Sequence, residues 1–560
     1  MRTLRHAALA TEPWTGIRGL AVIATVALLV HAPSLCDVGV RNLDFNAHYH
    51  WAVQFAEGLR HGDPYPRWMW RDDFGSGEPS LLFYSPLFYY LTAFVRLLTN
   101  NTWAAMRIVF VASTLLTGVI SWRTLRPFTG EWCALCGAAL LQAAPMVFML
   151  FYYFNGFPWA SSFAALVMLA CAMLRSDALQ HRVDVRVAFS IAALVLTHVV
   201  AALMALICFS AVCLCHVRRT TAGWAVDRGV ASWLVSVGCG LALAMVYLLP
   251  ALALMHEISP EVWTRDYTPW NAFAFPTITA FAFGFRWFTF QWPVPLVALL
   301  AVLFATVYAW RREDSQDAFG RALRLLLVIS WVSIFLASEL SYPLWLIPSP
   351  LRDVQFPHRF IYITSATGLI ADLLCVKEIL RSRGVGTLAL VGIAPLLLGL
   401  GLTTALSAKL ILDGKPLALE IDENGPFSGL AEYRLRTRGP DWNRYEGRGG
   451  FDAECRAHSL TCQQLDASSN RQAWQISGDR QALIRLPVFA FSAWRVTRDG
   501  LDASSSVDPS TGLILVAVPP GRHSIAVTWV RLGVERTGAA ASLIALLFLA
   551  LIAARQRRPA

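Results

Sequence analysis

Apolar residues occur in long runs through the first 406 residues and again near the end of the chain. A membrane-spanning helix needs about 17–25 mostly apolar residues. We predict twelve spans on this basis, and we divide one continuous apolar stretch at Thr197-His198 because that polar pair would otherwise lie deep in lipid. The predicted spans are residues 17–35, 105–123, 132–150, 158–174, 187–198, 199–216, 229–252, 294–310, 322–338, 359–376, 385–406 and 537–554.

The composition agrees with this pattern. Of the 560 residues, 56% are hydrophobic and only 15% are charged, which excludes a soluble protein of this size and indicates a polytopic α-helical membrane protein. A net charge of +10 would also suit a protein that binds nucleic acid. Here the basic residues lie mostly at the ends of apolar runs, and no soluble basic segment precedes residue 407, so we exclude nucleic acid as a partner.

The positions of the basic clusters predict the topology. When the spans alternate from a cytoplasmic N-terminus, these clusters all fall on the cytoplasmic side, which is the positive-inside pattern. Both termini are therefore expected in the cytoplasm, with residues 36–104, 253–293, 339–358 and 407–535 outside. Within the first external segment, the apolar residues 86–98 are expected to form a helix that lies in the outer interface. The clusters are Arg123 with Arg126, residues 175–186, Arg218 with Arg219 and Arg228, Arg311 with Arg312, residues 377–383, and residues 555–558.

Residues 407–535 change in character, because charged, Gly, Ser and turn residues replace the apolar runs. The predicted domains are thus a membrane core (residues 1–406), an external β-rich domain (407–535), and a final span with a cytoplasmic tail (536–560). Short β-rich runs separated by turn residues predict a small β-sandwich in the second half of the external domain. Cys455 and Cys462 are able to pair there in an oxidising periplasm. The predicted strands are residues 472–476, 481–488, 493–497, 513–518 and 523–530.

The densest polar and aromatic segment of the membrane part is residues 41–90, which directly follow the first predicted span. In a helix over residues 43–59, Asp44 and His48 would project from one face, since they are four residues apart. A carboxylate there suits proton abstraction from a hydroxyl, or a metal ion that offsets a phosphate leaving group. From spacing alone, the alternative is that Asp44 only caps the helix.

Other polar residues are predicted on the same side of the membrane. Arg67 suits a lipid phosphate or, alternatively, extends toward the headgroups without a specific ligand. His198 is a candidate for substrate binding or for a hydrogen bond between helices. The chain contains no Ser-His-Asp, HExxH or Walker pattern. The remaining candidates for substrate binding are Tyr84, Asn155, Asp266, Gln355, His358 and Arg359.

Several motifs resemble a known group of proteins. In the first external loop these are Asp44-x-x-x-His48, Gly62-Asp63-Pro64-Tyr65-Pro66-Arg67-Trp68, Gly75-x-Gly77-x-Pro79 and Phe83-Tyr84-x-Pro86-Leu87. They resemble the loop of bacterial membrane proteins called 6-pyruvoyl-tetrahydropterin synthase-related, which look like GT-C glycosyltransferases. Further motifs, which include Pro357-x-Arg359, Ala431-Glu432-Tyr433 and Gly521-x-His523, extend the resemblance, and the external domain is similar to that of YfhO-type proteins. We find no zinc-binding histidine set, so the pterin name implies no pterin chemistry.

The resemblance implies a GT-C-like core in the bacterial inner membrane and an inverting glycosyltransferase with a polyprenyl-phosphate sugar donor, such as an undecaprenyl-linked one. The acceptor would be an external glycan, lipid or protein. Asp44 matches the expected acidic residue and His48 would assist it, while Arg67, His358 and Arg359 would contact the lipid phosphate. The second external loop carries Asn155 instead of a further carboxylate, so catalysis with Mg²⁺ or Mn²⁺ on Asp44 and catalysis without a metal are both open. The alternative functions are a transporter or flippase of a lipid-linked saccharide and a non-catalytic envelope assembly protein.

Overall fold

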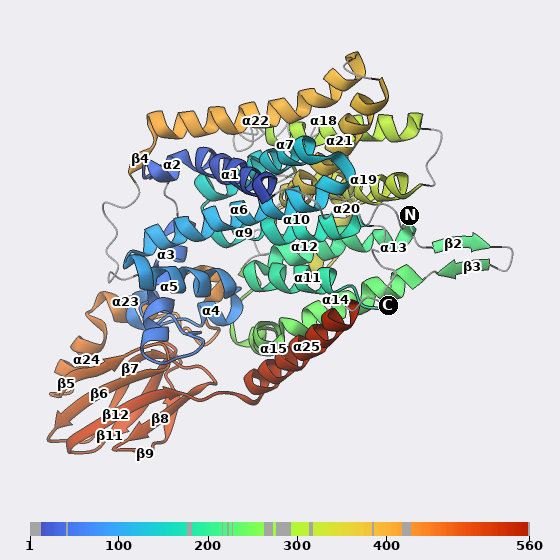
Figure 1. Ribbon diagram of the computed structural model, residues 1–560. Helices are drawn as coiled ribbons and strands as arrows, with labels where there is room; N and C mark the ends of the chain where they lie inside the picture. Colours follow the sequence, from blue (N-terminus) through green and yellow to red (C-terminus); the bar gives the residue numbers. More distant parts are fainter. Residues whose placement is uncertain are drawn as a thin grey trace.

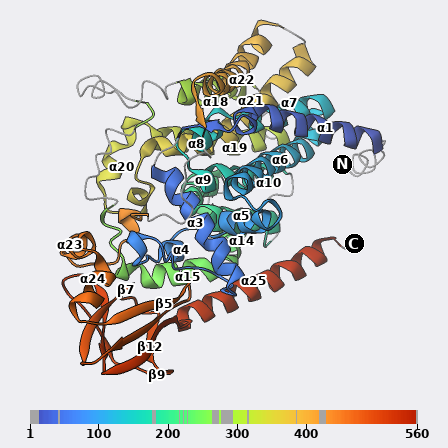
Figure 2. The same cartoon turned by 90° about the vertical axis from the view of Figure 1, so that its left-hand side faces the viewer.

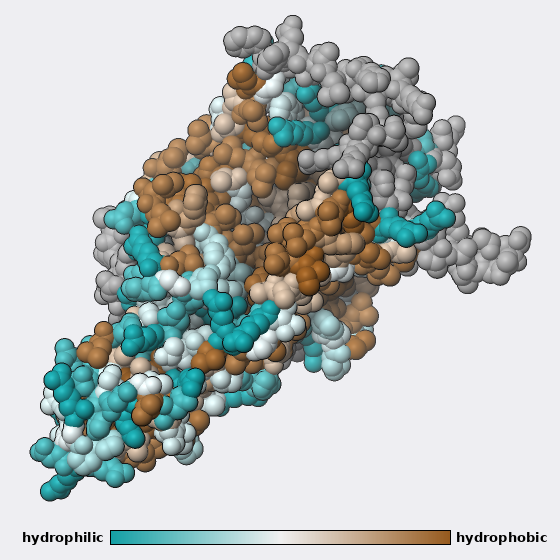
Figure 3. Space-filling view, turned by 60° about the horizontal axis from the view of Figure 1, so that its bottom comes forward, coloured by the Kyte–Doolittle hydropathy of each residue, from teal (hydrophilic) through white to brown (hydrophobic). Residues whose placement is uncertain are grey.

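The chain folds into a bundle of apolar helices with a β domain at one end (Figure 1). The computed structural model describes residues 13–40, 43–175, 182–215, 217–220, 223–226, 228–262, 273–275, 293–312, 317–383, 386–416 and 427–557. Apolar side chains gather on the surface of the helical part, and hydrophilic side chains gather on the β domain (Figure 3). This division of the surface is what a multi-pass membrane protein with a water-exposed domain requires.

Eight of the twelve predicted spans coincide with helices that are long and apolar enough to cross a bilayer. Seven of these pass the length and composition requirement on their own, and the eighth passes as a pair bent by 79°. The bent pair is α14 (Arg228–Leu243) with α15 (Met245–Leu254). The others are α6 (Thr102–Thr129), α7 with α8 (Glu131–Gln142 and Pro145–Tyr152), α18 (Pro293–Arg311), α19 (Ala318–Ala337), α21 (Ile361–Arg383), α22 (Thr387–Asp413) and α25 (Gly533–Arg557).

The other four predicted spans are shorter apolar helices, so the prediction of twelve full spans is confirmed only in part. Two of them, α11 (Val185–Thr197) and α12 (Val199–Ser210), have 13 and 12 residues. At 1.5 Å per residue each rises about 18–20 Å, which is less than the roughly 30 Å hydrocarbon core of a bilayer. Neither helix therefore has the length that a straight span needs. The remaining two are α1 (Pro13–Val30) and the pair α9 and α10 (Phe157–Ser161 and Phe163–Met173).

α11 and α12 break at His198, where the split was predicted, and they fold back on one another. His198 has an extended backbone that ends the first helix and begins the second. The Asp184 amide before α11 donates to Ser236 Oγ at 2.7 Å, and Trp233 Nε1 donates to Ser210 Oγ at the end of α12 at 3.3 Å. Since both ends of the pair thus lie beside the same stretch of α14, the two helices form a hairpin with His198 at its tip.

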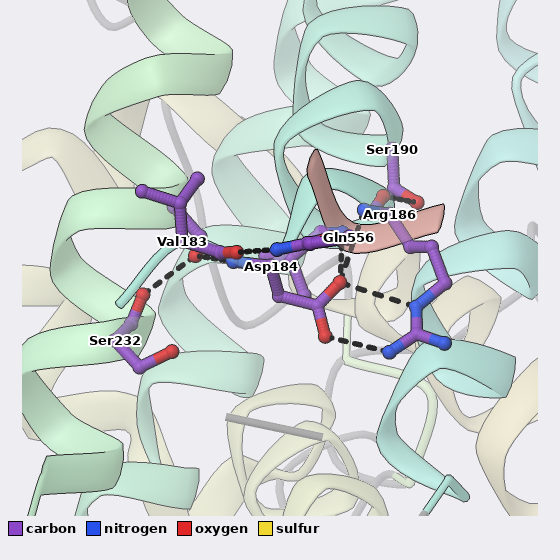
Figure 4. A network of polar contacts seen from close by, with 8 residues as sticks. Val183, Asp184, Arg186, Ser190, Ser232 and Gln556 are labelled. Carbon is purple, nitrogen blue, oxygen red and sulfur yellow. Dashed lines mark hydrogen bonds and ion pairs between the residues drawn. The ribbon is translucent and has the colours of Figure 1, made fainter. Parts of the chain in front are cut away.

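The open end of this hairpin is joined to the last helix by the polar network in Figure 4. Asp184 caps α11 by accepting hydrogen bonds from the Arg186 and Val187 amides, as is usual for Asp before a helix. Gln556 in α25 donates to the Val183 carbonyl at 3.1 Å. These contacts lie at the end of the bundle away from the β domain (Figure 1).

The helix predicted in the outer interface is α5 (Leu87–Thr99), and it is amphipathic. Its exposed face carries Leu91, Phe94, Leu97 and Leu98, whereas Phe88 is buried against the bundle. An exposed apolar stripe of this kind suits contact with lipid. The depth of α5 in the membrane remains a prediction.

The β domain has two antiparallel sheets, ordered β10-β11-β7 and β5-β6-β12-β8-β9. All five predicted strands are present, and their inward side chains, such as Ile484 and Ile525, are buried. The helices α23 (Trp442–Gly447) and α24 (Gly450–Ala457) precede the sheets, and the expected disulfide joins Cys455 of α24 to Cys462 of β5. The strands are β5 (Thr461–Ala467), β6 (Arg471–Gly478), β7 (Ala482–Phe489), β8 (Trp494–Arg498), β9 (Leu501–Asp502), β10 (Ser505–Val507), β11 (Leu513–Val518) and β12 (Gly521–Trp529).

The first external loop packs directly on the β domain. The buried Trp68 ring contacts Trp494 at 5.1 Å and Trp529 at 6.2 Å between ring centroids. The Phe489 amide donates to the Ser76 carbonyl at 3.1 Å. From this domain α25 runs along the edge of the bundle (Figure 2).

Candidate functional site

Asp44 lies in the first turn of α3 (Leu43–Arg60), which is helical as predicted. The helix dipole favours a carboxylate at this end. Asp44 is open to solvent, yet enough protein surrounds its carboxyl group for burial to raise its pKa, and the nearby Arg359 guanidinium offsets only part of that effect. A carboxylate with a raised pKa is better matched to proton transfer near neutral pH than an ordinary aspartate.

Arg359 is held by a short 3₁₀ turn, Pro357–Phe360, at the start of α21. Its Nη1 donates to the Val354 carbonyl at 2.9 Å, and its Cζ lies 5.2 Å from the Trp159 ring and 4.8 Å from the Phe356 ring. These contacts hold the half-buried guanidinium in place, and it interacts electrostatically with Asp44. The sequence places these two residues more than 300 positions apart, and the fold brings them together.

His48 lies one turn after Asp44 in the same helix, but it is buried. Its Nδ1 is 2.7 Å from the Tyr89 hydroxyl, and burial lowers the pKa of His48 to about 3. The imidazole is therefore neutral at physiological pH. Its ring also contacts Tyr84, at 5.4 Å between centroids.

The tip of the α11–α12 hairpin borders the same site. The His198 ring stacks on Trp159 at 5.5 Å and lies 6.1 Å from the Tyr84 ring. His198 Nδ1 accepts the Ala201 amide at 3.1 Å, which leaves the proton of a neutral ring on Nε2. Ser85 fixes the tip, since its Oγ donates to the Val195 carbonyl and accepts from the Val199 amide. Tyr84 and His198 are thus brought to the site by one shared connection.

Two further residues lie at this site, although the sequence did not predict them there. Glu432 and Tyr433 lie in a short 3₁₀ turn, Ala431–Tyr433, in the segment that leads to the β domain. Tyr433 is buried with its ring 6.3 Å from Tyr84 and 5.6 Å from Trp51, and Glu432 interacts electrostatically with Arg359. Their one sequence signal was the Ala431-Glu432-Tyr433 motif, which carried no chemical role there.

The other predicted residues occupy different positions. Asn155 is buried in a left-handed turn before α9 (φ 54°), and its Nδ2 donates to the Phe151 carbonyl at 3.3 Å. Gln355 has φ 65° and follows the preceding 3₁₀ turn, Pro350–Val354. His358 lies in the turn that carries Arg359 and stacks on Phe356 at 5.7 Å. Asp266 lies outside the described residues.

Arg67 makes different contacts from the residues around Asp44. It is buried, its Nε lies 3.2 Å from Glu535 Oε1, and its Cζ lies 3.8 Å from the centre of the Tyr65 ring. Glu535 is in the first turn of α25. Arg67 therefore joins the first external loop to the last helix.

A second group of acidic residues, Asp72, Asp73 and Glu78, is buried in the first external loop and was also missed. Asp72 accepts hydrogen bonds from Trp51 Nε1 at 2.7 Å and Gln54 Nε2 at 2.9 Å, and burial raises its pKa to about 7. Trp51 also contacts the rings of Tyr84 and Tyr433. Its hydrogen bond to Asp72 therefore helps to fix a side chain that packs against the site.

The side chains around Asp44 do not by themselves form a metal site. Among the described residues, no group of three or more His, Cys, Asp or Glu side chains is arranged to hold a metal ion. A divalent cation prefers several oxygen ligands. The mechanism proposed below therefore contains no step on a metal ion. Whether the reaction needs a metal stays an open prediction.

No family model matches the chain, and no curated protein matches it either. Among solved structures, it is similar to the arabinofuranosyltransferase AftD from Mycobacteria, with 18% identity and a TM-score of 0.43 over 70% of this chain and 27% of that chain. It is also similar to ArnT from Cupriavidus metallidurans bound to undecaprenyl phosphate, with 14% identity and a TM-score of 0.32 over 90% of this chain and 97% of that chain. This chain thus spans about a quarter of the AftD chain. We base no assignment on these low scores, and the functional argument rests on the site itself.

Proposed function

We propose that this protein is a membrane glycosyltransferase of the GT-C type, which moves a sugar from a polyprenyl-phosphate donor to an external glycan, lipid or protein acceptor. The observation that carries the proposal is that Asp44 and Arg359 lie close enough to interact electrostatically, among buried aromatic side chains. One group suits a proton acceptor and the other suits a phosphate. The site would face the periplasm in a bacterial inner membrane.

Asp44 acts as the general base in this mechanism. Its carboxylate takes the proton of the acceptor hydroxyl as the acceptor oxygen attacks the anomeric carbon of the sugar. The bond between that carbon and the phosphate oxygen breaks on the opposite face, which inverts the configuration. A base near the operating pH is the most effective, and the raised pKa of Asp44 moves it in that direction.

Arg359 stabilises the leaving group. Negative charge grows on the lipid phosphate as the sugar departs, and a fixed guanidinium beside it lowers the energy of the transition state. The stack of Trp159 and His198 holds this guanidinium in place, with the Nε2 proton of His198 available at the same edge. Tyr84, Gln355 and the turn that carries His358 would border the donor.

The test is transfer by the purified protein in lipid, with labelled polyprenyl-phosphate sugars and a panel of acceptors. Asp44→Asn keeps the size of the side chain and removes the base, so we expect transfer to fall by at least about 100-fold. The matched control is Asp413→Asn, an exposed acid at the end of α22 whose pair with Lys409 contributes little. Equal transfer by wild type and Asp44→Asn, or no transfer by folded wild type across the panel, would refute the proposal.

One observation favours transport of a lipid-linked saccharide as the alternative. Asp372 is fully buried in the middle of α21, and its carboxyl oxygens have no hydrogen-bond partner among the described residues. Acidic residues at this depth are typical of transport pathways. The test is movement of an unmodified lipid-linked saccharide across the membrane of liposomes that contain the protein. Movement that is lost in Asp372→Asn but kept in Asp44→Asn would establish transport instead of transfer.

A further inference from the structure

The backbone of Tyr84 is fixed on both sides. Its amide donates to the Ser80 carbonyl, one turn earlier, at 2.9 Å. The carbonyl of Phe83, just before it, accepts a hydrogen bond from the Tyr247 hydroxyl of α15 at 2.7 Å. Ser85, just after it, is bonded to the tip of the α11–α12 hairpin. The Tyr84 side chain therefore starts from a point that two separate parts of the bundle hold in place.

The ring of Tyr84 is held by packing. Five aromatic rings contact it, and four of these contacts are edge-to-face, which is a favourable arrangement for aromatic pairs. Because the ring is enclosed in this way, its direction does not depend on any hydrogen bond. The centroids lie at 5.4 Å for His48, 5.5 Å for Trp51, 6.1 Å for Tyr89 and His198, and 6.3 Å for Tyr433.

The hydroxyl group of Tyr84 has no hydrogen-bond partner in the described part of the chain. Neighbouring tyrosine hydroxyls are paired, since that of Tyr89 lies 2.7 Å from His48 Nδ1 and that of Tyr90 donates to the Pro64 carbonyl at 2.6 Å. The Tyr84 side chain is only half-buried, and its hydroxyl oxygen is not enclosed by protein. Burial of the ring raises the pKa of Tyr84, so the hydroxyl keeps its proton. The site therefore contains a rigid hydrogen-bond donor that is open to a ligand.

Ring contacts connect Tyr84 to both charged groups of the site. On one side is His48 in α3, one helical turn after the proposed base. On the other side is His198, which stacks on Trp159 at 5.5 Å, and the Cζ atom of Arg359 lies 5.2 Å from the same Trp159 ring. In the proposed reaction, the bond between the sugar and the phosphate lies between the base and the guanidinium. The Tyr84 hydroxyl is thus placed to contact the donor.

We propose that the Tyr84 hydroxyl donates a hydrogen bond to a phosphate oxygen of the polyprenyl-linked donor and shares with Arg359 the charge that grows there. This inference rests on the proposed function. The proton of the acceptor goes to Asp44, and the electron pair of the broken bond stays on the phosphate. The second pKa of a phosphate monoester is about 6, so the leaving oxygen needs no proton at pH 7.5. Tyr84 therefore keeps its own proton and acts only as a hydrogen-bond donor that is already in position.

This role separates the effects of the hydroxyl on folding and on transfer. Tyr84→Phe keeps the ring and breaks no hydrogen bond within the described residues, so we expect an unchanged unfolding temperature. Tyr247→Phe removes a hydroxyl that holds the fold, because it leaves the Phe83 carbonyl without this bond, and it should lower the unfolding temperature. A loss of transfer in Tyr84→Phe at constant stability therefore reports on the ligand.

The experiment compares wild type with Tyr84→Phe in lipid nanodiscs of one composition, so that general binding to phospholipid headgroups is the same in every sample. The first measurement is the affinity for undecaprenyl phosphate at pH 7.5. We expect Tyr84→Phe to lower this affinity about tenfold, as for one lost hydrogen bond to a charged group. The second measurement is kcat for sugar transfer, which should fall by about tenfold or more.

The matched control is Tyr445→Phe. The Tyr445 hydroxyl also has no hydrogen-bond partner among the described residues, but it belongs to α23 beside the β sheets, so this variant should change neither quantity. Unchanged affinity and transfer in folded Tyr84→Phe would overturn this inference alone. Reduced transfer with unchanged affinity for undecaprenyl phosphate would also overturn it, because the hydroxyl would then contact the sugar or the acceptor. Failure of wild type to bind undecaprenyl phosphate and to transfer would overturn the proposed function as well.

Discussion

Ser85 Oγ accepts a hydrogen bond from the Val199 amide at 2.9 Å, and this contact joins the first external loop to the tip of the α11–α12 hairpin. The same hydroxyl donates to the Val195 carbonyl at 2.8 Å. One side chain therefore pairs two backbone groups that the break at His198 leaves without helical partners. The position of His198 beside Tyr84 depends on it.

We expect Ser85→Ala to destabilise the protein by about 1–3 kcal/mol, because it leaves a half-buried amide and a buried carbonyl unpaired. Transfer activity should fall as well, since the tip of the hairpin loses its connection to Tyr84. Thermal unfolding in detergent and the transfer assay measure the two effects. Ser382→Ala is the control, since the Ser382 hydroxyl only bonds back to its own helix near its end. Equal losses in both variants would exclude a special role for Ser85.

The pH dependence of transfer should report on Asp44. Activity requires the carboxylate, so it falls as the pH drops through the pKa of Asp44, which burial raises and Arg359 lowers. Replacing Arg359 by Gln removes the lowering contribution, and the acidic limb of the kcat/KM profile should move to higher pH. A control with Arg352→Gln, in the preceding turn, should leave the limb in place. A limb that moves to lower pH in Arg359→Gln would contradict the assignment.

The stability of the protein should fall between acidic and neutral pH because of Asp72. Burial raises its pKa from 3.8 to about 7. Between these values the unfolded chain has lost the proton that the folded chain keeps, so the free energy of unfolding decreases as the pH rises and levels off above pH 7. Asp72→Asn should remove this contribution to the slope of the unfolding free energy against pH. The variant protein should also be less stable at acidic pH, because the Asn side chain accepts fewer hydrogen bonds. Unfolding curves at several pH values from 4.5 to 8 test the difference in slope, and identical slopes would refute it.

The ion pair of Arg67 and Glu535 should stabilise the connection of the first external loop to α25. Removing one partner leaves the other buried and charged, so Arg67→Met or Glu535→Met should cost about 3–5 kcal/mol. The double variant Arg67→Met with Glu535→Met should cost less than the sum of the two. A double-mutant cycle of unfolding free energies measures the coupling. Additive effects would show that the pair has no joint role.

Local patterns in the sequence predicted most of the elements. The apolar runs located eight long spans, the polar pair at Thr197-His198 located the break between α11 and α12, and the alternating runs located five strands of the β domain. Each of these features depends on residues that are close together in the chain. The lengths of the helices were less predictable, because a hairpin of two short helices has the same composition as two full spans.

The site was predicted in part. Asp44, Tyr84, His198 and Arg359 do come together, whereas Arg67 forms an ion pair with Glu535. Glu432 and Tyr433 were missed because their contact with the site is made by the fold and has no local pattern. Asp72, Asp73 and Glu78 were missed because charged residues in a loop are normally exposed. Their burial comes from contacts with distant segments, such as α3 for Asp72 and Arg438 for Asp73.

Because Asp44 precedes the main helix bundle and Glu432 follows it, the site has a consequence for biosynthesis. A ribosome makes Asp44 early, but the segment of Glu432 and Tyr433 reaches the site only after α22 has been inserted, and α25 must follow before Arg67 meets Glu535. Incomplete chains that stop within the membrane core would therefore lack part of the site. Under the proposed function, the order of synthesis alone would keep a half-made protein from acting on the lipid-linked donor.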